Sequence, residues 1–402
     1  MDISIRPSRL AGSVAAIPSK SAAHRLLICA ALSQGETEIY CPSLSKDIEA
    51  TAACLAALGA SIDYSGGSFH VKPIEKPLDG AVLDCGESGS TLRFLLPVIC
   101  ALGCEATIKM HGRLPYRPLS PLWEELIAHG AELSRPTEDT ISVSGQLEQG
   151  SYSIRADISS QYISGLLFAL PLLKGESRLE LTGKVESLGY IHMTRQALAR
   201  FSLELSYEKG CFFIPADARL LSPGKALVEG DWSNAAFWLV ASALCGDSIE
   251  LSGLESASAQ GDRAVVQAIA DISAGGAVID CRDIPDLVQV LSVLAAATPG
   301  RTEFINAGRL RIKESDRLAA VRRMISALGG HCTELSEGLV IEGREKLSGG
   351  VVDGENDHRI VMSAAVASTV CTGEVRILGA QAADKSYPAF FNDFKALGGI
   401  IS

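Results

Sequence analysis

The sequence has no uncharged apolar run near the roughly 18 residues that suggest a membrane span. Its first ten residues, MDISIRPSRL, contain an acid and two arginines but no apolar core typical of a signal peptide. Positive charge is not in excess either, because the formal net charge is −11, which argues against a nucleic-acid surface. We therefore expect a cytoplasmic protein with neither a membrane nor a nucleic-acid partner.

The eleven cysteines are scattered along the chain and form no C-x-x-C pair. Their odd number favours free thiols in a reducing compartment, and no clustered ligands suggest a zinc site. The chain also has neither a Walker loop nor a dinucleotide fingerprint. We expect no metal and no organic cofactor.

What the sequence does have is apolar residues enough for large cores, at 47% of 402 residues, and a repeated pattern. An apolar stretch of helical length is followed six times by a glycine and a short alternating strand, which predicts mixed α and β repeats. We expect these glycines, and those that end a second helix in most repeats, to follow helix ends at positive φ. The third repeat has LARFSLELSY in place of the second-helix glycine. The six glycines are Gly35, Gly103, Gly175, Gly246, Gly300 and Gly373.

Basic residues stand at the expected starts of four helices, where the helix dipole disfavours a cation by about 0.3–1 kcal/mol each. Such an arrangement favours a ligand that brings negative charge, of the phosphate type. A Gly/Ser-rich turn, residues 86–91, opens one of these helices and offers backbone N–H groups. The residues concerned are Lys20 and Arg25, Arg93, Lys313 and Arg317, and His358 and Arg359 after the expected N-cap Asp357.

Two acids lie near these bases. Glu314 is either a proton-handling group or an ion-pair partner of a neighbouring base, and Asp286 is either a functional acid or an ordinary residue of a helix start. His358 is either an acid–base group or a solvated residue of a helix start. The segment 159–162 is either a serine cap with a polar first turn or a set of neutral donors for a phosphate.

Several motifs, in their order and spacing, resemble the 5-enolpyruvylshikimate-3-phosphate synthases over essentially the whole chain. These motifs are PSKSAAHR, GESGSTLR, YRP, SSQY, ESLGY, IPD, RIKESDR, NDHR and DKSYP. The resemblance implies an α/β (α+β) fold of two similar domains, each an inside-out barrel of three βαβαββ repeats, with the active site in the interdomain cleft. The domains would be residues 19–228 and residues 1–18 plus 229–402, with hinges near 18 and 228.

The resemblance also implies an enzyme of the shikimate pathway that leads to chorismate and the aromatic amino acids, and that is a glyphosate target. It would act as a monomer, through a tetrahedral intermediate and without a cofactor. Its substrates would be shikimate 3-phosphate and phosphoenolpyruvate. Asp286, Glu314, Lys20 and His358 would handle protons, and the proton for the methylene carbon would come from Glu314 or Lys20. Shikimate 3-phosphate would bind to Lys20, Ser21, Arg25, Ser159, Ser160, Gln161, Ser187, Tyr190, Asp286 and Lys313. Phosphoenolpyruvate would bind to Lys20, Gly89, Arg117, Gln161, Arg317, Arg359 and Lys385.

Two positions depart from a common family version, since Glu87 and Arg309 stand where other members carry Asn, and we assign neither a role. The main alternative is the UDP-N-acetylglucosamine enolpyruvyl transferase family. That family has Lys-Asn where this chain has Lys20-Ser21, and a loop cysteine that GRLPYRP lacks. A repeat scaffold without catalytic activity is the alternative from another class.

Overall fold

The computed structural model describes residues 1–246 and 248–402 and divides into two compact units. Unit 1 contains Met1–Ile17 and Gly230–Ser402, and unit 2 contains Pro18–Glu229. Among the described residues, none of the helices combines the length and apolarity that a membrane crossing needs.

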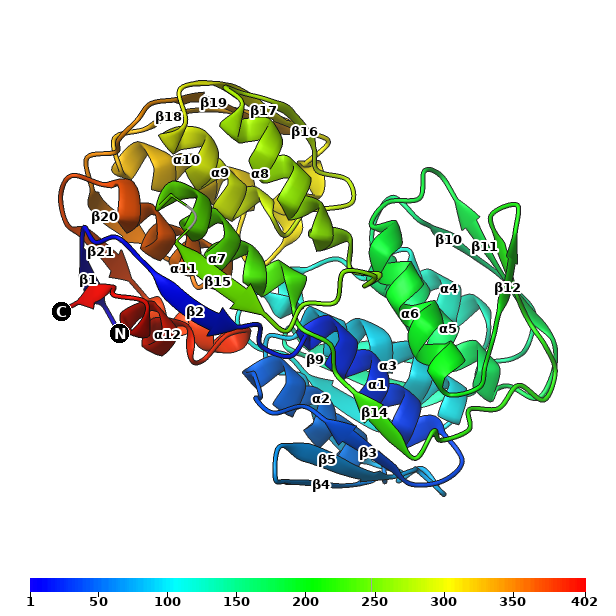
Figure 1. The fold of residues 1–402 in the computed structure, drawn as a ribbon. Coiled ribbons are helices and arrows are strands. Elements are labelled where there is room, and N and C mark those ends of the chain that lie inside the picture. Colours follow the sequence, from blue (N-terminus) through cyan, green and yellow to red (C-terminus); the bar gives the residue numbers. More distant parts are fainter. Residues whose placement is uncertain (247) are drawn as a thin grey trace. The chain divides into compact units, whose positions relative to one another are not determined.

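Unit 2 contains four-stranded sheets at its outside with helices between them (Figure 1). In each sheet the first two strands are parallel and the remaining pairs are antiparallel, which is the β-α-β-α-β-β order of the expected repeat. In spatial order the sheets are β14 (Lys225–Leu227), β3 (Thr37–Tyr40), β5 (Ser68–Lys72) and β4 (Ser61–Ser65); β6 (Ala81–Asp84), β7 (Ala106–Lys109), β9 (Thr140–Gly145) and β8 (Ala131–Thr137); and β10 (Ser151–Arg155), β11 (Ser177–Thr182), β13 (Cys211–Ile214) and β12 (Ser206–Glu208). The helices are α1 (Lys20–Leu32), α2 (Lys46–Ala57), α3 (Gly89–Leu102), α4 (Leu122–Ala128), α5 (Ser160–Ala169) and α6 (Leu188–Arg200).

Unit 1 repeats this arrangement with one reduced repeat. Its described four-stranded sheets are β16 (Val278–Asp280), β17 (Gly300–Ile305), β19 (Gly338–Gly343) and β18 (His331–Leu335); and β20 (Gly350–Asp353), β21 (Val375–Leu378), β1 (Ile3–Arg6) and β22 (Ile400–Ile401). The third is only a parallel pair, β15 (Ile249–Ser252) with β2 (Gly12–Ala15). The helices are α7 (Trp232–Leu244), α8 (Val265–Ser273), α9 (Val288–Ala297), α10 (Arg317–Ala327), α11 (His358–Ala367) and α12 (Phe390–Ala396). Because α8 leads directly to β16 without a hairpin, the spacing from Gly246 to Gly300 is the shortest of the six-repeat pattern.

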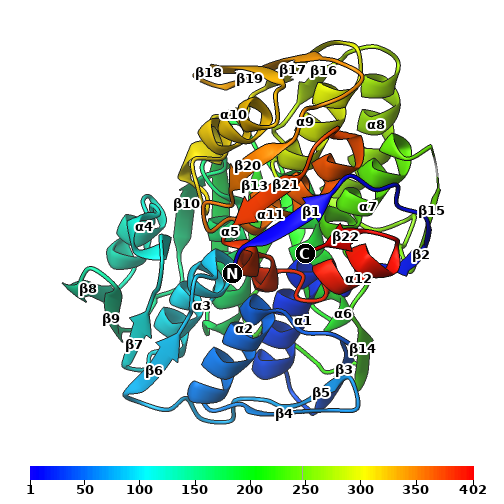
Figure 2. The ribbon, with the colours of Figure 1, turned by 90° about the vertical axis from the view of Figure 1, so that its left-hand side faces the viewer.

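The two ends of the chain belong to the same sheet of unit 1. Strand β1 pairs antiparallel with β21 on one side and with β22 on the other, as Figure 2 shows. The N-terminal strand therefore takes the place that a hairpin strand occupies in the complete repeats.

The first helix of each repeat is apolar on nearly all sides and forms the core of its unit. Nearly all residues of α3 and α9 are buried, which is the pattern of a central helix and not of a surface helix. Gly165 lets α5 approach α3, because a Cβ there would lie 2.2 Å from the carbonyl oxygen of Arg93. This packing brings the start of α5 beside the first turns of α3.

The glycine prediction is confirmed for the second helices, but among the first helices only Gly103 and Gly246 stand directly at the helix end with positive φ. Gly59, Gly130, Gly275, Gly329 and Gly398 each follow the C-cap of a second helix at positive φ. Gly35 and Gly300 have positive φ but lie two residues beyond the C-caps Ser33 and Thr298, and Gly300 begins β17. Gly175 and Gly373, which follow the 3₁₀ turns at Leu170–Leu172 and Ser368–Val370, do not have positive φ.

Candidate active-site residues

In unit 2, the first helix of each of the three repeats begins at a candidate residue. A serine directly before that residue caps the helix. The hydroxyls of Ser19, Ser88 and Ser159 accept from the backbone N–H groups of Ala22, Thr91 and Gln161, at 3.3, 3.2 and 3.3 Å. Lys20, Gly89 and Ser160 are therefore the first residues of α1, α3 and α5. A side-chain cap satisfies one of the donors at a helix start, so the first turns keep N–H groups suited to an anion.

Arg25 is buried and held by hydrogen bonds from three directions. Its guanidinium donates to the backbone oxygen of Ser21 at 2.7 Å, to the backbone oxygen of Tyr190 at 3.0 Å and to the hydroxyl of Thr194 at 2.9 Å. Burial lowers the pKa of Arg25 to about 10, so the side chain remains a cation at neutral pH. The side chain of Arg25 thus connects three of the predicted residues, because it bonds to the backbones of both Ser21 and Tyr190.

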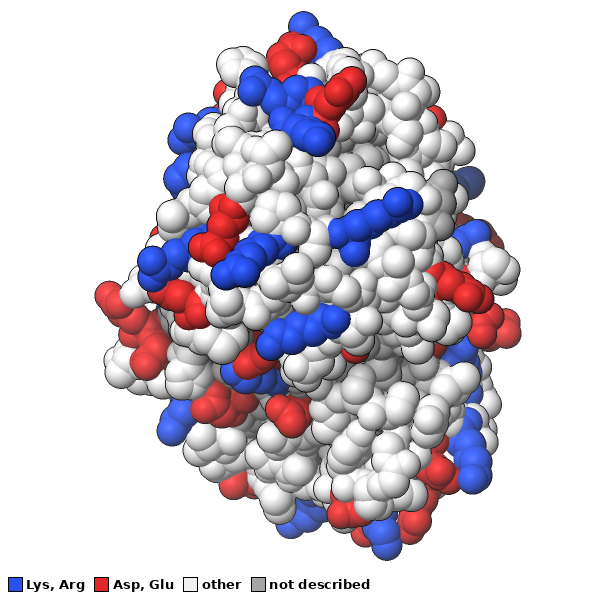
Figure 3. All heavy atoms as spheres, turned by 60° about the vertical axis from the view of Figure 1, so that its left-hand side comes forward, with Lys and Arg blue, Asp and Glu red and all other residues white. Residues whose placement is uncertain are grey.

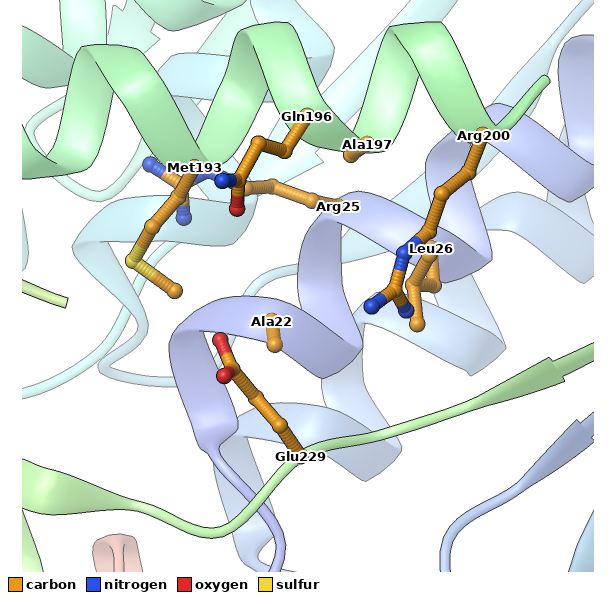
Figure 4. Close-up of a pocket in the computed structure, with 8 residues that line it drawn as sticks. All are labelled: Ala22, Arg25, Leu26, Met193, Gln196, Ala197, Arg200 and Glu229. Carbon is orange, nitrogen blue, oxygen red and sulfur yellow. The ribbon is translucent and has the colours of Figure 1, made fainter. Parts of the chain in front are cut away.

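A small pocket lies beside Arg25, between α1 and α6 (Figure 4). Its volume is about 20 Å³, which is room for roughly one water molecule and not for a phosphorylated substrate. Met193 and Gln196 line it from α6, and Glu229 lines it from the end of unit 2. The pocket is therefore a packing gap behind Arg25.

Lys20 forms an ion pair that the sequence did not predict. Its ammonium lies 2.7 Å from Oδ2 of Asp47, in the first turn of α2, and both side chains are mostly buried, with 19% and 15% exposed. An acidic residue at the start of a neighbouring helix is a common feature of helices, so the sequence offered no signal that distinguished Asp47.

Gly89 lies directly against two arginines. A Cβ at this position would be 2.6 Å from Nη1 of Arg93 and 2.8 Å from Nη1 of Arg117, so only glycine fits there without a shift of both guanidiniums. Arg93 also donates to the side-chain oxygen of Gln161 at 3.1 Å, while the amide nitrogen of Gln161 donates to Ser90 at 3.0 Å. Two guanidinium groups and a helix start thus converge where phosphoenolpyruvate is expected.

Ser187 precedes α6 in a left-handed backbone conformation, with φ 55° and ψ 44°. Such a conformation is uncommon for a residue with a side chain and costs about 1–3 kcal/mol, and it is typical of functional sites. Ser187 is also buried.

In unit 1, Arg317 is the centre of a cluster of carboxylates. Its guanidinium lies 2.7 Å from Asp286, 2.8 Å from Glu314 and 2.8 Å from Asp357, and only 2% of its side chain is exposed. The carboxylates raise the pKa of Arg317 above its ordinary value against the opposing effect of burial. The position of this cation at a helix start is therefore balanced within the protein and does not by itself require a ligand.

Asp286 connects Arg317 with Arg359. One carboxylate oxygen of Asp286 accepts from Arg317, the other lies 3.3 Å from Arg359, and the backbone oxygen of Asp286 accepts from Arg359 at 2.8 Å. Burial alone would raise the pKa of Asp286, but Arg359, Arg317 and Lys313 together lower it well below its usual range. Asp286 is therefore a carboxylate at every pH at which proteins usually work.

Asp357 has a second role beside its predicted one. It caps α11 by accepting from the backbone N–H of Arg359 at 3.0 Å, which confirms the N-cap, and it also binds Arg317 through the same carboxylate. Burial acts to raise its pKa, while Arg317 and the neighbouring His358 lower it below the ordinary value. Lys385 donates to the backbone oxygen of Asn356, which fixes it beside this cap.

Two predicted positions need correction. Lys313 does not lie in a helical turn, because α10 begins at Arg317 with Asp316 as its cap, and Lys313 ends the preceding 3₁₀ segment. Asp286 lies just before α9, which begins at Val288, and not in its first turn. A bend at residues 313–315 precedes the cap of α10, and a turn at residues 285–287 precedes α9. The side chains of Lys313 and Asp286 therefore extend from loops.

The two positions left without a role contact site-bearing loops. A Cβ at Gly112 would lie 2.3 Å from the carboxylate of Glu87, so Glu87 lies against the loop that carries Arg117. Arg309 donates to the backbone oxygen of Arg282 at 2.7 Å, in the loop that leads to Asp286.

The comparisons with known proteins agree with one another. The family model of EPSP synthase (3-phosphoshikimate 1-carboxyvinyltransferase) matches residues 5–394. A protein of Clostridium kluyveri named 3-phosphoshikimate 1-carboxyvinyltransferase is 40% identical, covering 99% of this chain and 98% of its own length, and one of Clostridium acetobutylicum is 39% identical with the same coverage.

The fold has solved counterparts. The structure of EPSP synthase from Acinetobacter baumannii superposes with a TM-score of 0.82 at 22% identity, covering 100% of this chain and 99% of that chain. This likeness confirms the predicted α/β fold class. The family match and the relatives confirm the resemblance found in the sequence, and the chain belongs to the EPSP synthase (3-phosphoshikimate 1-carboxyvinyltransferase) family.

Proposed function

We propose that the chain performs the reaction of its family: it transfers the enolpyruvyl group of phosphoenolpyruvate to the 5-hydroxyl of shikimate 3-phosphate and releases phosphate. The product, 5-enolpyruvylshikimate 3-phosphate, is a precursor of chorismate and the aromatic amino acids. The observation that supports this proposal best is the contact of Asp286 with both Arg317 and Arg359. A carboxylate base beside two cations suits an alcohol that must attack an anionic donor.

Shikimate 3-phosphate would bind largely to unit 2. Its phosphate suits the start of α5, where Ser159, Ser160 and Gln161 offer hydroxyl, amide and backbone donors. Arg25, Ser21 and Tyr190 form one connected group and would hold the ring and its carboxylate, joined by Lys20, whereas Ser187 would join the contacts to the phosphate. From unit 1, Lys313 would add a cation and Asp286 would face the 5-hydroxyl.

Phosphoenolpyruvate would use cations from both units. Arg117 beside Gly89 supplies charge and a close approach to backbone N–H groups, with Gln161 and Lys20 at the neighbouring helix starts. Arg317, Arg359 and Lys385 would hold the donor's anionic groups and then the departing phosphate.

The reaction would be an addition followed by an elimination. Protonation of the methylene carbon of phosphoenolpyruvate makes C2 electrophilic, and the 5-hydroxyl attacks C2 while Asp286 accepts its proton. The tetrahedral intermediate then loses phosphate from C2 and a proton from the methyl group, which restores the double bond. Acid–base help of this kind contributes about 10²–10⁴-fold to a rate.

Substrate anions would make Asp286 a better base. In the protein alone, Arg359 and Arg317 hold the pKa of Asp286 low, although burial acts in the opposite direction. A bound phosphoenolpyruvate would offset the charge of both arginines, so the carboxylate would gain proton affinity when its substrate is present. His358 and Glu314 stay candidates for proton transfer, and the choice between Glu314 and Lys20 as donor to the methylene carbon stays open.

We infer a cytoplasmic location, since all eleven cysteines are free thiols and ten of them are buried. We infer a monomer from the resemblance to the family. On the face drawn in Figure 3, Lys and Arg side chains lie among Asp and Glu side chains, unlike the continuous basic surface that binds nucleic acid.

The test is an assay of inorganic phosphate release by the full chain. Release that requires both shikimate 3-phosphate and phosphoenolpyruvate is the expected result, and Arg25→Ala and Arg359→Ala should each lower it by at least tenfold. Folded protein that releases no phosphate with both substrates would refute the proposal. Release with UDP-N-acetylglucosamine in place of shikimate 3-phosphate would assign the other enolpyruvyl transferase activity.

A further inference from the structure

A chain of buried, hydrogen-bonded side chains links the N-terminal halves of helices α1, α2 and α3 in unit 2. Nδ1 of His24 on α1 lies 2.6 Å from the hydroxyl of Thr51 on α2, and that hydroxyl lies 2.6 Å from the hydroxyl of Thr91 on α3. Thr91 then donates to the hydroxyl of Ser88 at 2.8 Å. His24, Thr51, Thr91 and Ser88 are each 0% exposed.

The chain ends on the residue that sets the start of α3. The hydroxyl of Ser88 accepts from both the hydroxyl and the backbone N–H of Thr91, at 2.8 and 3.2 Å, and so caps the helix. The next residue is Gly89, against which the guanidinium groups of Arg93 and Arg117 lie. Any displacement of the cap would therefore move the helix start, which carries Gly89, relative to Arg117.

The chain also runs parallel to the ion pair of Lys20. Lys20 and His24 are one turn apart on α1, and their partners Asp47 and Thr51 are one turn apart on α2. Residues four apart on a helix lie on the same face, so the two contacts form successive links between the same pair of helices. His24 thus lies between the Lys20 contact and the cap of α3.

The direction of the hydrogen bonds identifies the form of the imidazole. Because Thr91 donates to Ser88, its oxygen is left to accept from Thr51, and Thr51 in turn accepts from His24. Nδ1 of His24 must therefore carry the proton. Nε2 is then a bare nitrogen, which agrees with its burial without a hydrogen-bond partner, since an orphan acceptor is tolerated better than an orphan N–H.

The imidazole stays neutral in this setting. Burial lowers the pKa of His24 well below 6.5, and the positive charges of Lys20 and Arg25 lower it further. A neutral imidazole has one N–H, and here that N–H is committed to Thr51.

We propose that His24 is a positioning residue that fixes the start of helix α3, and with it Gly89, through this chain of buried hydroxyl groups. The inference rests on the proposed role of Gly89 and Arg117 in binding phosphoenolpyruvate. His24 touches no substrate in this account and acts through the helix cap.

The experiment measures KM for each substrate, kcat and thermal unfolding in His24→Leu, Thr51→Val and the double variant. We expect each single variant to raise KM for phosphoenolpyruvate about tenfold, with KM for shikimate 3-phosphate within twofold. The double variant should be no worse than the worse single variant, because both changes interrupt one chain. His24→Asn should restore most of the loss, because its amide offers an N–H near the position of Nδ1.

Controls separate a positioning role from a general defect of the core. Thr302→Val removes a buried threonine hydroxyl from β17 in unit 1 and should leave both KM values unchanged. Equal changes in both KM values, or no change in KM for phosphoenolpyruvate, would overturn the proposal. If Arg117→Ala also leaves that KM unchanged, the proposed donor site itself is wrong, whereas a large effect of Arg117→Ala with none at His24 refutes only the positioning role.

A second measurement reads the tautomer directly. The ¹⁵N spectrum of the folded chain, with the His24 signals assigned by their loss in His24→Asn, should show a protonated Nδ1 and a bare Nε2. A protonated Nε2 at His24 would reverse the hydrogen-bond chain and contradict the inference.

Discussion

At the scale of single residues, the structure shows how buried cations are kept in place before any substrate arrives. Arg317 contacts Asp286, Glu314 and Asp357, and Lys20 contacts Asp47. An unpaired buried charge would cost several kcal/mol, so these carboxylates make the cationic sites tolerable to the fold. Each substrate anion must therefore either displace a carboxylate from its cation or bind the cation beside that carboxylate.

Arg317→Lys tests the geometry of this cluster, because lysine keeps the charge but cannot bind several carboxylates with one planar fork. We expect the free energy of unfolding to fall by about 2 kcal/mol and KM for phosphoenolpyruvate to rise at least tenfold. Arg323→Lys is the matched control, since Arg323 is on the same helix and pairs with Glu355 at the surface with 50% of its side chain exposed. The control should change unfolding by less than about 0.5 kcal/mol. Equal effects of the two changes would show that the cluster has no special role.

Asp286→Asn separates catalysis from binding. The amide cannot accept the hydroxyl proton, so kcat should fall by about 10²–10⁴-fold. KM for phosphoenolpyruvate should stay the same or decrease, because Arg317 and Arg359 lose a competing negative charge. Steady-state kinetics with both substrates measures the two constants, and an unchanged kcat would remove Asp286 from the reaction.

The lowered pKa values of Asp286 and Asp357 predict how stability depends on pH. Burial opposes the shifts, but Arg359 and Arg317 at Asp286, and Arg317 and His358 at Asp357, lower both values. The unfolded carboxyls titrate near pH 3.9, so the stabilisation is complete above about pH 5 and is lost as the pH falls toward the lowered values. Urea unfolding between pH 7 and 3 should show this loss, with a smaller slope in Arg317→Lys. A slope that is the same in both proteins would contradict the assigned cause.

Much of the candidate site could be predicted at the residue scale, but not its partners. Lys20, Gly89 and Ser160 stand at helix starts as the motifs imply, because capping serines and glycines are local signals. Asp47 and the second role of Asp357 escaped prediction. Their contacts join residues 27 and 40 positions apart on separate helices, and no local pattern carries that information.

At the scale of secondary structure, the repeats place a left-handed residue after each second helix. Five repeats use glycine, whereas the repeat of α6 has Ser202 at φ 63°, where the backbone N–H of Leu203 bonds to the oxygen of Leu198. The sequence showed that the glycine is missing, and the structure shows that the conformation is kept. Serine in this conformation costs free energy that glycine does not.

Ser202→Gly should therefore stabilise the protein by about 0.5–1 kcal/mol and raise the midpoint of thermal unfolding. Gly275→Ser is the reverse change at the corresponding position after α8, with φ 110° and no heavy atom nearer than 3.9 Å to the added Cβ. It should destabilise by about 1 kcal/mol through backbone strain alone. A lower midpoint for Ser202→Gly would show that the serine side chain contributes more than its strain costs.

At the scale of the whole molecule, both units carry cations near the starts of helices. Unit 2 presents Lys20 and Arg25 on α1, and unit 1 presents Arg317 and Arg359 on α10 and α11. The repeat pattern in the sequence predicted mixed α and β repeats, and the family resemblance implied the βαβαββ order. Neither showed that the α7 repeat is reduced to the strand pair β15 and β2, without a hairpin between α8 and β16. The proposed function requires that residues of both units take part in one reaction.

Hydrogen exchange of backbone amides in the full chain tests this claim most directly. Peptides covering Gly89–Arg93 and Ser160–Ile163 in unit 2, and Lys313–Ala319 and His358–Val361 in unit 1, are compared with and without the two substrates at reaction equilibrium. We expect slower exchange in all four peptides when both substrates are present. Slower exchange confined to the peptides of one unit would contradict it.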